Sequence, residues 1–200
     1  MFLSQASAFS ENIKIVTVDS LEKEVLRQKT EEIYEDELPL AKEIAEKLFA
    51  ALQPLLPAAG LAAPQIGISK SVFIFSFDRD PKNFEVVINP QFVPMSDEVI
   101  EGWESCFSVL LQMAKVPRYQ TIKATFLNLN GEKVEKVLEG FAAKVFQHEY
   151  DHLQGVENID RKDSLVKSFE SREELIAYLQ EVKKEDSTRY VKPIQTEKNL

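Results

Sequence analysis

The sequence predicts an α+β fold with a central helix, an N-terminal helix and a C-terminal helix. Strand patterns gather in the first two thirds of the chain, around one early helix. A helix-period stretch at 140–153 comes only after them, and another at 172–185 closes the pattern. Because strands and helices do not alternate one by one, we expect antiparallel or mixed sheets rather than βαβ units.

The N-terminal part predicts a short strand and then a helix. Residues 13–18 alternate apolar and polar side chains, which is typical of a strand. Residues 36–56 favour a helix, because Pro39 lies where a first turn tolerates proline and one apolar stripe recurs at helical spacing. The stripe consists of Leu40, Ile44, Leu48 and Leu52.

The middle of the chain is rich in strand signals. Residues 57–67 are small and turn-rich, so no regular element is expected throughout them. Residues 71–77 and 84–90 are candidate buried strands, and Pro90 is expected to close the second. Residues 121–138 predict a hairpin in which Asn130 and Gly131 supply the positive φ of a tight turn.

Two helices are predicted after the hairpin. The first covers 140–153, and Gly155 is its expected stop. The second covers 172–185, where Ser171 and Glu174 have the spacing of a capping box. Residues 186–200 predict no regular secondary structure.

Composition narrows the function class. The chain has 200 residues, 44% hydrophobic and 28% charged residues, and a net charge of −9, which argues against broad nucleic-acid binding. No apolar run has the length of a membrane span, and no signal or transit peptide is recognisable before Lys14. We therefore expect a cytoplasmic protein with no membrane or nucleic-acid partner. A single cysteine, Cys106, excludes an internal disulfide.

Both histidines of the chain lie in the predicted helix at 140–153. His148 and His152 are four residues apart, so one helical face presents both rings and can chelate a divalent metal. Glu149 lies about 100° around the helix from His148, near enough to take a proton from water on the ion. The competing interpretation is a helix with two ordinary core or surface histidines.

A metal held by this pair needs a third protein ligand. Asn158 stands where one peptidase group has a third histidine, and it is a poor ligand. Three glutamates are available further along, but they begin a capped helix, where acidic residues are normal; they are Glu170, Glu173 and Glu174. Cys106 remains, as a soft thiolate in a turn-like stretch before a strand, although a lone cysteine is most often a small buried hydrophobe.

Three segments resemble, in order and spacing, the motifs of peptide deformylases. They are GLAAPQIG at 60–67, ESCFS at 104–108 and QHEYDHLQG at 147–155. The family patterns are G-x-G-L-A-A-x-Q, E-G-C-L-S and Q-H-E-x-D-H-L-x-G. The resemblance implies sheets packed around a central helix that carries the metal-binding histidines. It also implies removal of the formyl group from the N-terminal formyl-methionine of new bacterial proteins.

The resemblance also implies a role for each matching residue. The metal ligands would be Cys106, His148 and His152. Glu149 would be the general base and then the acid, while Gln65 and the backbone N–H of Phe107 would stabilise the oxyanion. Gly60, with Ala59 beside it, would let the substrate backbone approach. Glu104 and Arg118 would brace the site.

The cofactor implied is one divalent ion per chain, Fe²⁺ first, with Zn²⁺, Ni²⁺ or Co²⁺ as alternatives. The partners implied are the formylated N-terminus of a nascent peptide and, through the C-terminal tail, the ribosome. We expect a catalytic domain over 1–165 and a C-terminal helix and tail over 166–200, packed on that domain or extending from it.

The sequence departs from the family patterns at four positions. They are Ala58, Ser105, Phe107 and Leu110. None removes a ligand or the base, but Phe107 enlarges the apolar wall of the expected substrate cleft. Two alternatives therefore stay open: a metal-dependent amidase or peptidase with another acyl substrate, and a non-catalytic, deformylase-like binding protein.

Overall fold

The computed structural model describes residues 13–78, 80 and 82–187. The helices are α1 (Leu38–Leu52), α2 (Gly140–Leu153) and α3 (Arg172–Ser187). The strands are β1 (Gly60–Ala62), β2 (Val72–Ser76), β3 (Phe84–Pro94), β4 (Val99–Cys106), β5 (Val109–Tyr119), β6 (Thr121–Leu127), β7 (Lys133–Glu139) and β8 (Leu165–Ser168).

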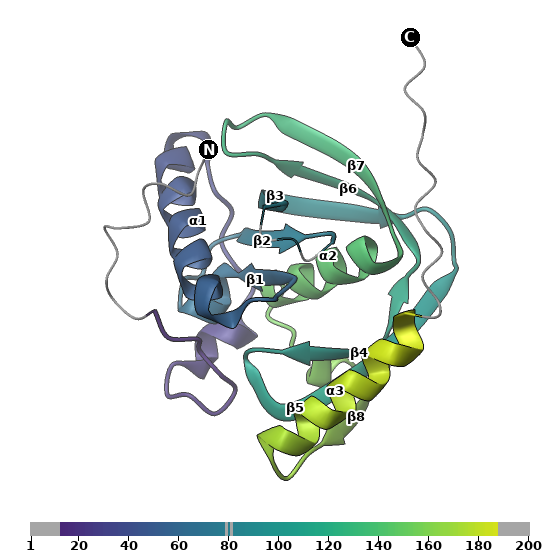
Figure 1. Ribbon diagram of the computed structural model, residues 1–200. Coiled ribbons are helices and arrows are strands. Elements are labelled where there is room, and N and C mark those ends of the chain that lie inside the picture. Colours follow the sequence, from purple (N-terminus) through teal and green to yellow (C-terminus); the bar gives the residue numbers. More distant parts are fainter. Residues whose placement is uncertain (1–12, 79, 81, 188–200) are drawn as a thin grey trace.

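Two antiparallel sheets enclose α2. The larger sheet has five strands in the order β1-β2-β3-β6-β7, and the smaller has three in the order β4-β5-β8. Figure 1 shows α2 between the two sheets, with α1 against the larger sheet and α3 along the smaller one. The α+β class and the central helix are confirmed.

Strand β2 is buried on both faces, which explains its continuous apolar run. Val72 and Ile74 belong to the core cluster that includes α1, whereas Phe73 and Phe75 belong to the cluster that includes α2. The ring of Phe146 on α2 lies 5.2 Å from that of Phe73 and 5.7 Å from that of Phe75, both edge-on. The strand therefore fixes both helices at once.

The apolar stripe of α1 is only partly as predicted. Ile44, Leu48 and Leu52 are buried, but Leu40 is 37% exposed. Ala41 and Ala45 are buried in its place. The buried face of α1 is therefore displaced from the predicted stripe.

Two strand predictions need correction. Residues 13–18 form no strand. Isolated backbone hydrogen bonds hold this segment instead: Val16 N donates to Gln65 O and Val18 N donates to Ser108 O. Pro90 does not end β3, which continues to Pro94. The pairing of β3 with β6 shifts register between Ile88 and Gln91, so proline is not needed as a hydrogen-bond donor between the two strands.

The turn between β6 and β7 also differs from the prediction. The strands pair from Thr121 with Glu139 to Leu127 with Lys133, so the hairpin itself is confirmed. The connection runs through residues 128–132, and Gly131 is its only residue with positive φ, at 76°. A longer loop therefore replaces the tight Asn-Gly turn. The side-chain oxygen of Asn128 closes this loop by accepting hydrogen bonds from Asn130 N and Glu132 N.

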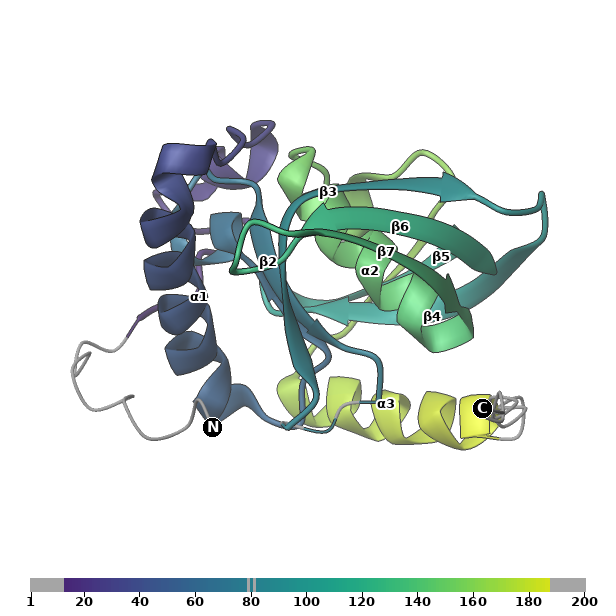
Figure 2. The ribbon, with the colours of Figure 1, turned by 90° about the horizontal axis from the view of Figure 1, so that it is seen from above.

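Helix α3 covers the smaller sheet, as Figure 2 shows from above. Its Tyr178 packs edge-on against Trp103 of β4 and beside Phe169. Glu174 N donates to the Ser171 hydroxyl as predicted, but the Glu174 carboxylate accepts from Glu170 N, so the reciprocal bond is shifted by one residue. The predicted irregular tail lies largely outside the described residues, which end at 187.

Helix α2 ends as predicted, and the ending permits a test of stability. Gly155 has φ +71°, and a Cβ there would lie 2.6 Å from the carbonyl carbon of Arg27, which is backbone and cannot swing away. Gly155→Ala should therefore lower the free energy of unfolding by about 2–5 kcal/mol, combining left-handed strain with overpacking. Urea denaturation of the metal-free chain measures this loss.

Gly140 supplies the matched control for that substitution. Its φ is +56°, but nothing lies within 4 Å of an added Cβ. Gly140→Ala should cost only the backbone strain, about 1–2 kcal/mol. Equal losses for the two variants would show that the contact with Arg27 does not constrain the turn after α2.

Candidate metal centre

Three predicted ligands meet where β4 ends beneath α2. The sulfur of Cys106 and one ring nitrogen each of His148 and His152 lie within 4.8 Å of one another. Cys106 Sγ is 3.4 Å from His152 Nε2, and the two imidazole rings are 5.0 Å apart and nearly perpendicular. Strand β4 and helix α2, which lie side by side in Figure 1, thus contribute to one compact group of donors.

Cys106 is presented by a hairpin rather than by the predicted turn-like stretch. It is the last residue of β4, and β5 begins three residues later. The register shifts between Ser105 and Cys106, and Ser108 N donates a 3.4 Å hydrogen bond to Cys106 Sγ. The bulge and the short turn direct the sulfur toward α2.

Each histidine ring is held by a carboxylate. His148 Nδ1 lies 2.9 Å from Glu104 Oε2, and His152 Nδ1 lies 3.1 Å from Glu157 Oε1. A ring whose Nδ1–H donates to a carboxylate offers Nε2 as the free ligand atom. Both rings are therefore prepared to bind an ion through Nε2.

The predicted pair of Glu104 and Arg118 is present and buried. Arg118 Nε donates to Glu104 Oε1 at 3.0 Å and Nη2 donates to Oε2 at 2.9 Å, a two-point contact. Arg118 also contacts Asp151 and the carbonyl of Gln147 on α2. The guanidinium thus locks the strand carboxylate to the helix that carries both histidines.

Gln65 lies against the same group. Its side chain is 2% exposed, and Nε2 lies 3.4 Å from Cys106 Sγ and 3.2 Å from the Ser108 hydroxyl. Its Oε1 accepts a hydrogen bond from Ala62 N, which fixes the amide with its donors toward the sulfur. Gln65 is therefore positioned to donate toward a molecule bound at this centre.

Glu149 faces Gly60 across the site. A Cβ on Gly60 would lie 2.4 Å from Glu149 Oε1, so a glycine is needed for the carboxylate to occupy this position. Glu149 Oε2 is buried and accepts no hydrogen bond from the described residues. Burial raises the pKa of Glu149, which makes its carboxylate a better proton acceptor.

The electrostatics favour a thiolate at Cys106. Burial alone would raise the pKa of the thiol, but the charge of His152 and hydrogen bonds from both histidines outweigh burial and lower it. A thiolate with two imidazoles is a donor set that suits Zn²⁺, Fe²⁺ or another divalent transition ion. This donor set, with the unpartnered oxygen of Glu149 beside it, fits a divalent metal.

The other ligand candidates lie elsewhere. Glu170, Glu173 and Glu174 are exposed at the start of α3. Asn158 is buried, but its amide donates to the carbonyl of Glu104. Glu157 next to it was missed by the sequence analysis, and its spacing of five residues from His152, just past the helix stop, was the signal available.

The four departures have modest structural effects. Ala58 is buried in the core with ordinary backbone, and Ser105 is exposed. Phe107 packs against the α1 core cluster, directly after the cysteine. Leu110 is 58% exposed, so it leaves the metal group untouched. Ala59 directly precedes β1, and its carbonyl accepts a hydrogen bond from Ser76 N.

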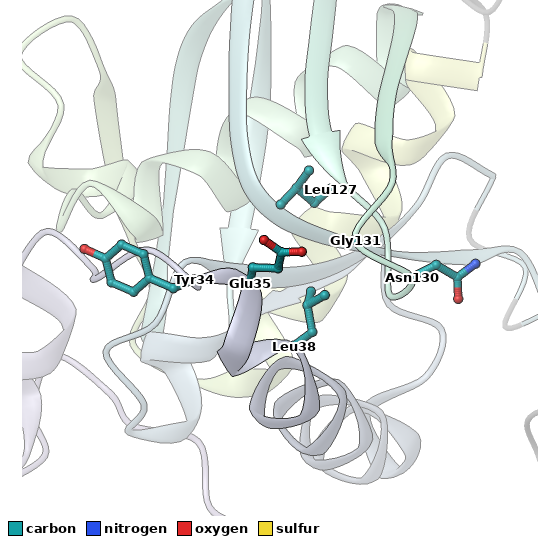
Figure 3. A pocket seen from close by; sticks show the side chains of 6 residues that line it. All are labelled: Tyr34, Glu35, Leu38, Leu127, Asn130 and Gly131. Atoms are coloured by element: carbon teal, nitrogen blue, oxygen red, sulfur yellow. The ribbon is translucent and has the colours of Figure 1, made fainter.

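A separate pocket lies between the start of α1 and the loop joining β6 to β7. Its volume is about 380 Å³, and Figure 3 shows Glu35 and Leu38 lying opposite Leu127 and Asn130. None of the metal-centre residues lines it. Among the described residues, no helix is both long and apolar enough to cross a membrane.

The chain is similar in sequence and fold to proteins of one known family. A model of the polypeptide deformylase family matches residues 14–168. Peptide deformylase 2 of Ralstonia nicotianae is 46% identical over 107 residues, which cover 49% of this chain and 59% of that protein. The peptide deformylase of Pseudothermotoga lettingae is 36% identical over 165 residues, covering 81% and 91% respectively.

Solved structures agree with these sequence matches. A class I type b peptide deformylase from Acinetobacter baumannii with Met-Ala-Ser bound has a TM-score of 0.68 and 31% identity, covering 76% of this chain and 100% of that one. The peptide deformylase of Thermotoga maritima gives 0.66 and 34%, with 76% and 97% covered. Several of the curated relatives are matched over only about 60% of their length.

Proposed function

Because the chain belongs to the peptide deformylase family, we propose that it hydrolyses the N-formyl group of N-terminal formyl-methionine in newly made polypeptides. The observation that carries this proposal is the meeting of the thiol, the two imidazoles and the Glu149 carboxylate beside Gly60. The tripeptide Met-Ala-Ser bound to the Acinetobacter neighbour supports the same substrate class.

Cys106, His148 and His152 are proposed to hold one divalent ion, Fe²⁺ in the first place, with Zn²⁺, Ni²⁺ or Co²⁺ as alternatives. When bound, such an ion acidifies water and polarises a carbonyl oxygen. Glu149 accepts the proton of the attacking water and then returns it to the departing amine nitrogen. Gln65 Nε2 and the N–H of Phe107 donate hydrogen bonds to the formyl oxygen as negative charge develops there.

The peptide part of the substrate is proposed to align with β1. This strand is at the end of the larger sheet, so among the described residues one of its edges has no partner strand in the sheet. An extended peptide can add to such an edge through backbone hydrogen bonds. Gly60, with Ala59 beside it, lets the peptide pass close to Glu149, since a side chain at Gly60 would collide with that carboxylate.

We also propose where in the cell the reaction takes place. The substrate would be a nascent chain in the cytoplasm of a bacterium. Docking to the ribosome through the C-terminal segment is part of the proposal, although residues 188–200 lie outside the described part of the chain. We assign residues 1–165 to catalysis and 166–200 to the appended helix and tail.

The direct test is hydrolysis of formyl-Met-Ala-Ser. The chain, purified without oxygen and loaded with Fe²⁺ or Ni²⁺, should release formate, with metal counted in the same sample. Full metal content without turnover would contradict the proposed substrate. Phe107→Leu combined with Ser105→Gly would then show whether these two departures close the cleft.

A further inference from the structure

Glu157 is a buried carboxylate that the proposed reaction does not use. Its side chain is 1% exposed, and its carboxylate contacts both His152 and the thiol of Cys106. One oxygen is 3.1 Å from His152 Nδ1, and the other is 3.8 Å from Cys106 Sγ. A carboxylate so close to two candidate ligands calls for a role at the same centre.

The backbone of the turn after α2 determines where Glu157 lies. Gly155, in the left-handed conformation, reverses the chain after α2, and Val156 N donates back to the carbonyl of Asp151. Asn158 Nδ2 then donates to the carbonyl of Glu104, which ties the returning chain to β4. Glu157 lies between these two anchors, so its carboxylate is directed toward His152 by the fold of the turn.

Glu104 and Glu157 differ in the cation that balances their negative charge. Glu104 is paired with the buried guanidinium of Arg118. In the described part of the chain, Glu157 has no lysine or arginine partner, and its only ion-pair partner is His152. A buried carboxylate is costly unless a cation balances it, and a divalent ion bound by Cys106 and the histidines would supply that cation.

We infer that Glu157 is a second positioning residue of the metal centre, which fixes the His152 ring and adds a negative charge, balanced by no lysine or arginine of the described residues, that strengthens divalent-cation binding. This inference rests on the proposed metal centre. In this chain each of the two histidines then has its own carboxylate, Glu104 for His148 and Glu157 for His152. Outer partners of this kind typically change metal affinity by about 10–100-fold.

The test compares Co²⁺ binding by the full chain and two variants. Glu157→Gln keeps an acceptor of the same shape but removes the charge, and Glu157→Leu removes both. We expect the Co²⁺ affinity, measured by chelator competition, to fall about 10–100-fold in Glu157→Leu and by a smaller factor in Glu157→Gln. The thiolate-to-cobalt absorption should shift in Glu157→Leu, because the His152 ring is released.

Asn158→Ala is the matched control, since it loosens the same turn but leaves the carboxylate. It should lower the stability of the metal-free chain and keep the cobalt spectrum. If it reproduces the full affinity loss and spectral shift of Glu157→Leu, the turn and not the carboxylate is responsible, and the inference is overturned. Should Glu157→Leu fail to fold, the affinity of Glu157→Gln decides.

Two further outcomes separate this inference from the proposed function. A wild-type chain that binds Co²⁺ tightly, with both Glu157 variants matching its affinity and spectrum, contradicts the inference alone. A wild-type chain that binds no Co²⁺ contradicts the metal centre itself and the inference with it.

Discussion

Replacing Glu149 by alanine should lower the rate of deformylation by about 10²–10⁴-fold and leave the metal content unchanged. Glu149 is buried beside Gly60, and one of its oxygens accepts no hydrogen bond from the described residues, so the carboxylate is free to take a proton. It is not one of the three residues whose ligand atoms cluster. Removing it therefore removes the proposed proton carrier but none of the three candidate ligands.

Two measurements on the same sample check this expectation. Formate release from formyl-Met-Ala-Ser gives the rate, and elemental analysis gives the metal bound per chain. Glu149→Gln, which has the same shape and cannot accept a proton as a carboxylate does, should be as slow as Glu149→Ala. Near-normal turnover in either variant would exclude Glu149 as the general base.

Local patterns predicted those elements whose structure is decided by neighbouring residues. Helix α2 begins at Gly140 and turns at Gly155 as its periodicity and glycine indicated, because capping and φ are local properties. The same locality explains why the i, i+4 spacing placed His148 and His152 together. Elimination left Cys106 as the third ligand candidate, and the resemblance to known motifs supported it and added Gln65; periodicity alone connects neither residue to the helix.

Features that depend on distant contacts were not predictable in this way. The bulge that carries β3 past Pro90 accompanies Asn89, whose side chain bonds both backbone groups of Ile33, 56 positions away along the chain. Glu157 was missed for a similar reason. Its position depends on the turn after α2 being tied to β4, and the spacing of five residues from His152 does not by itself reveal that contact.

Replacing Cys106 by alanine should cost more metal affinity than any other single change described above. Cys106 is the only one of the three clustered residues that comes from β4, and it supplies the only soft anionic donor. The two remaining imidazoles lie on one helix and leave the ion without its thiolate. We expect the affinity to fall by more than the roughly 10–100-fold that follows loss of an outer partner, and turnover to fall with it.

The fold itself should survive that substitution, which makes the result interpretable. Arg118 still joins Glu104 to α2, and Gln147 still clamps Tyr119 through both backbone groups. The metal-free variant should therefore unfold in urea close to the metal-free wild type, while chelator competition reports the lost affinity.

Oxidation of Cys106 to the sulfinate in the wild-type chain should also release the ion, because a sulfinate is a different ligand from a thiolate. Full metal occupancy in either case would show that the ion does not depend on the sulfur, and the ligand assignment would have to move to other residues.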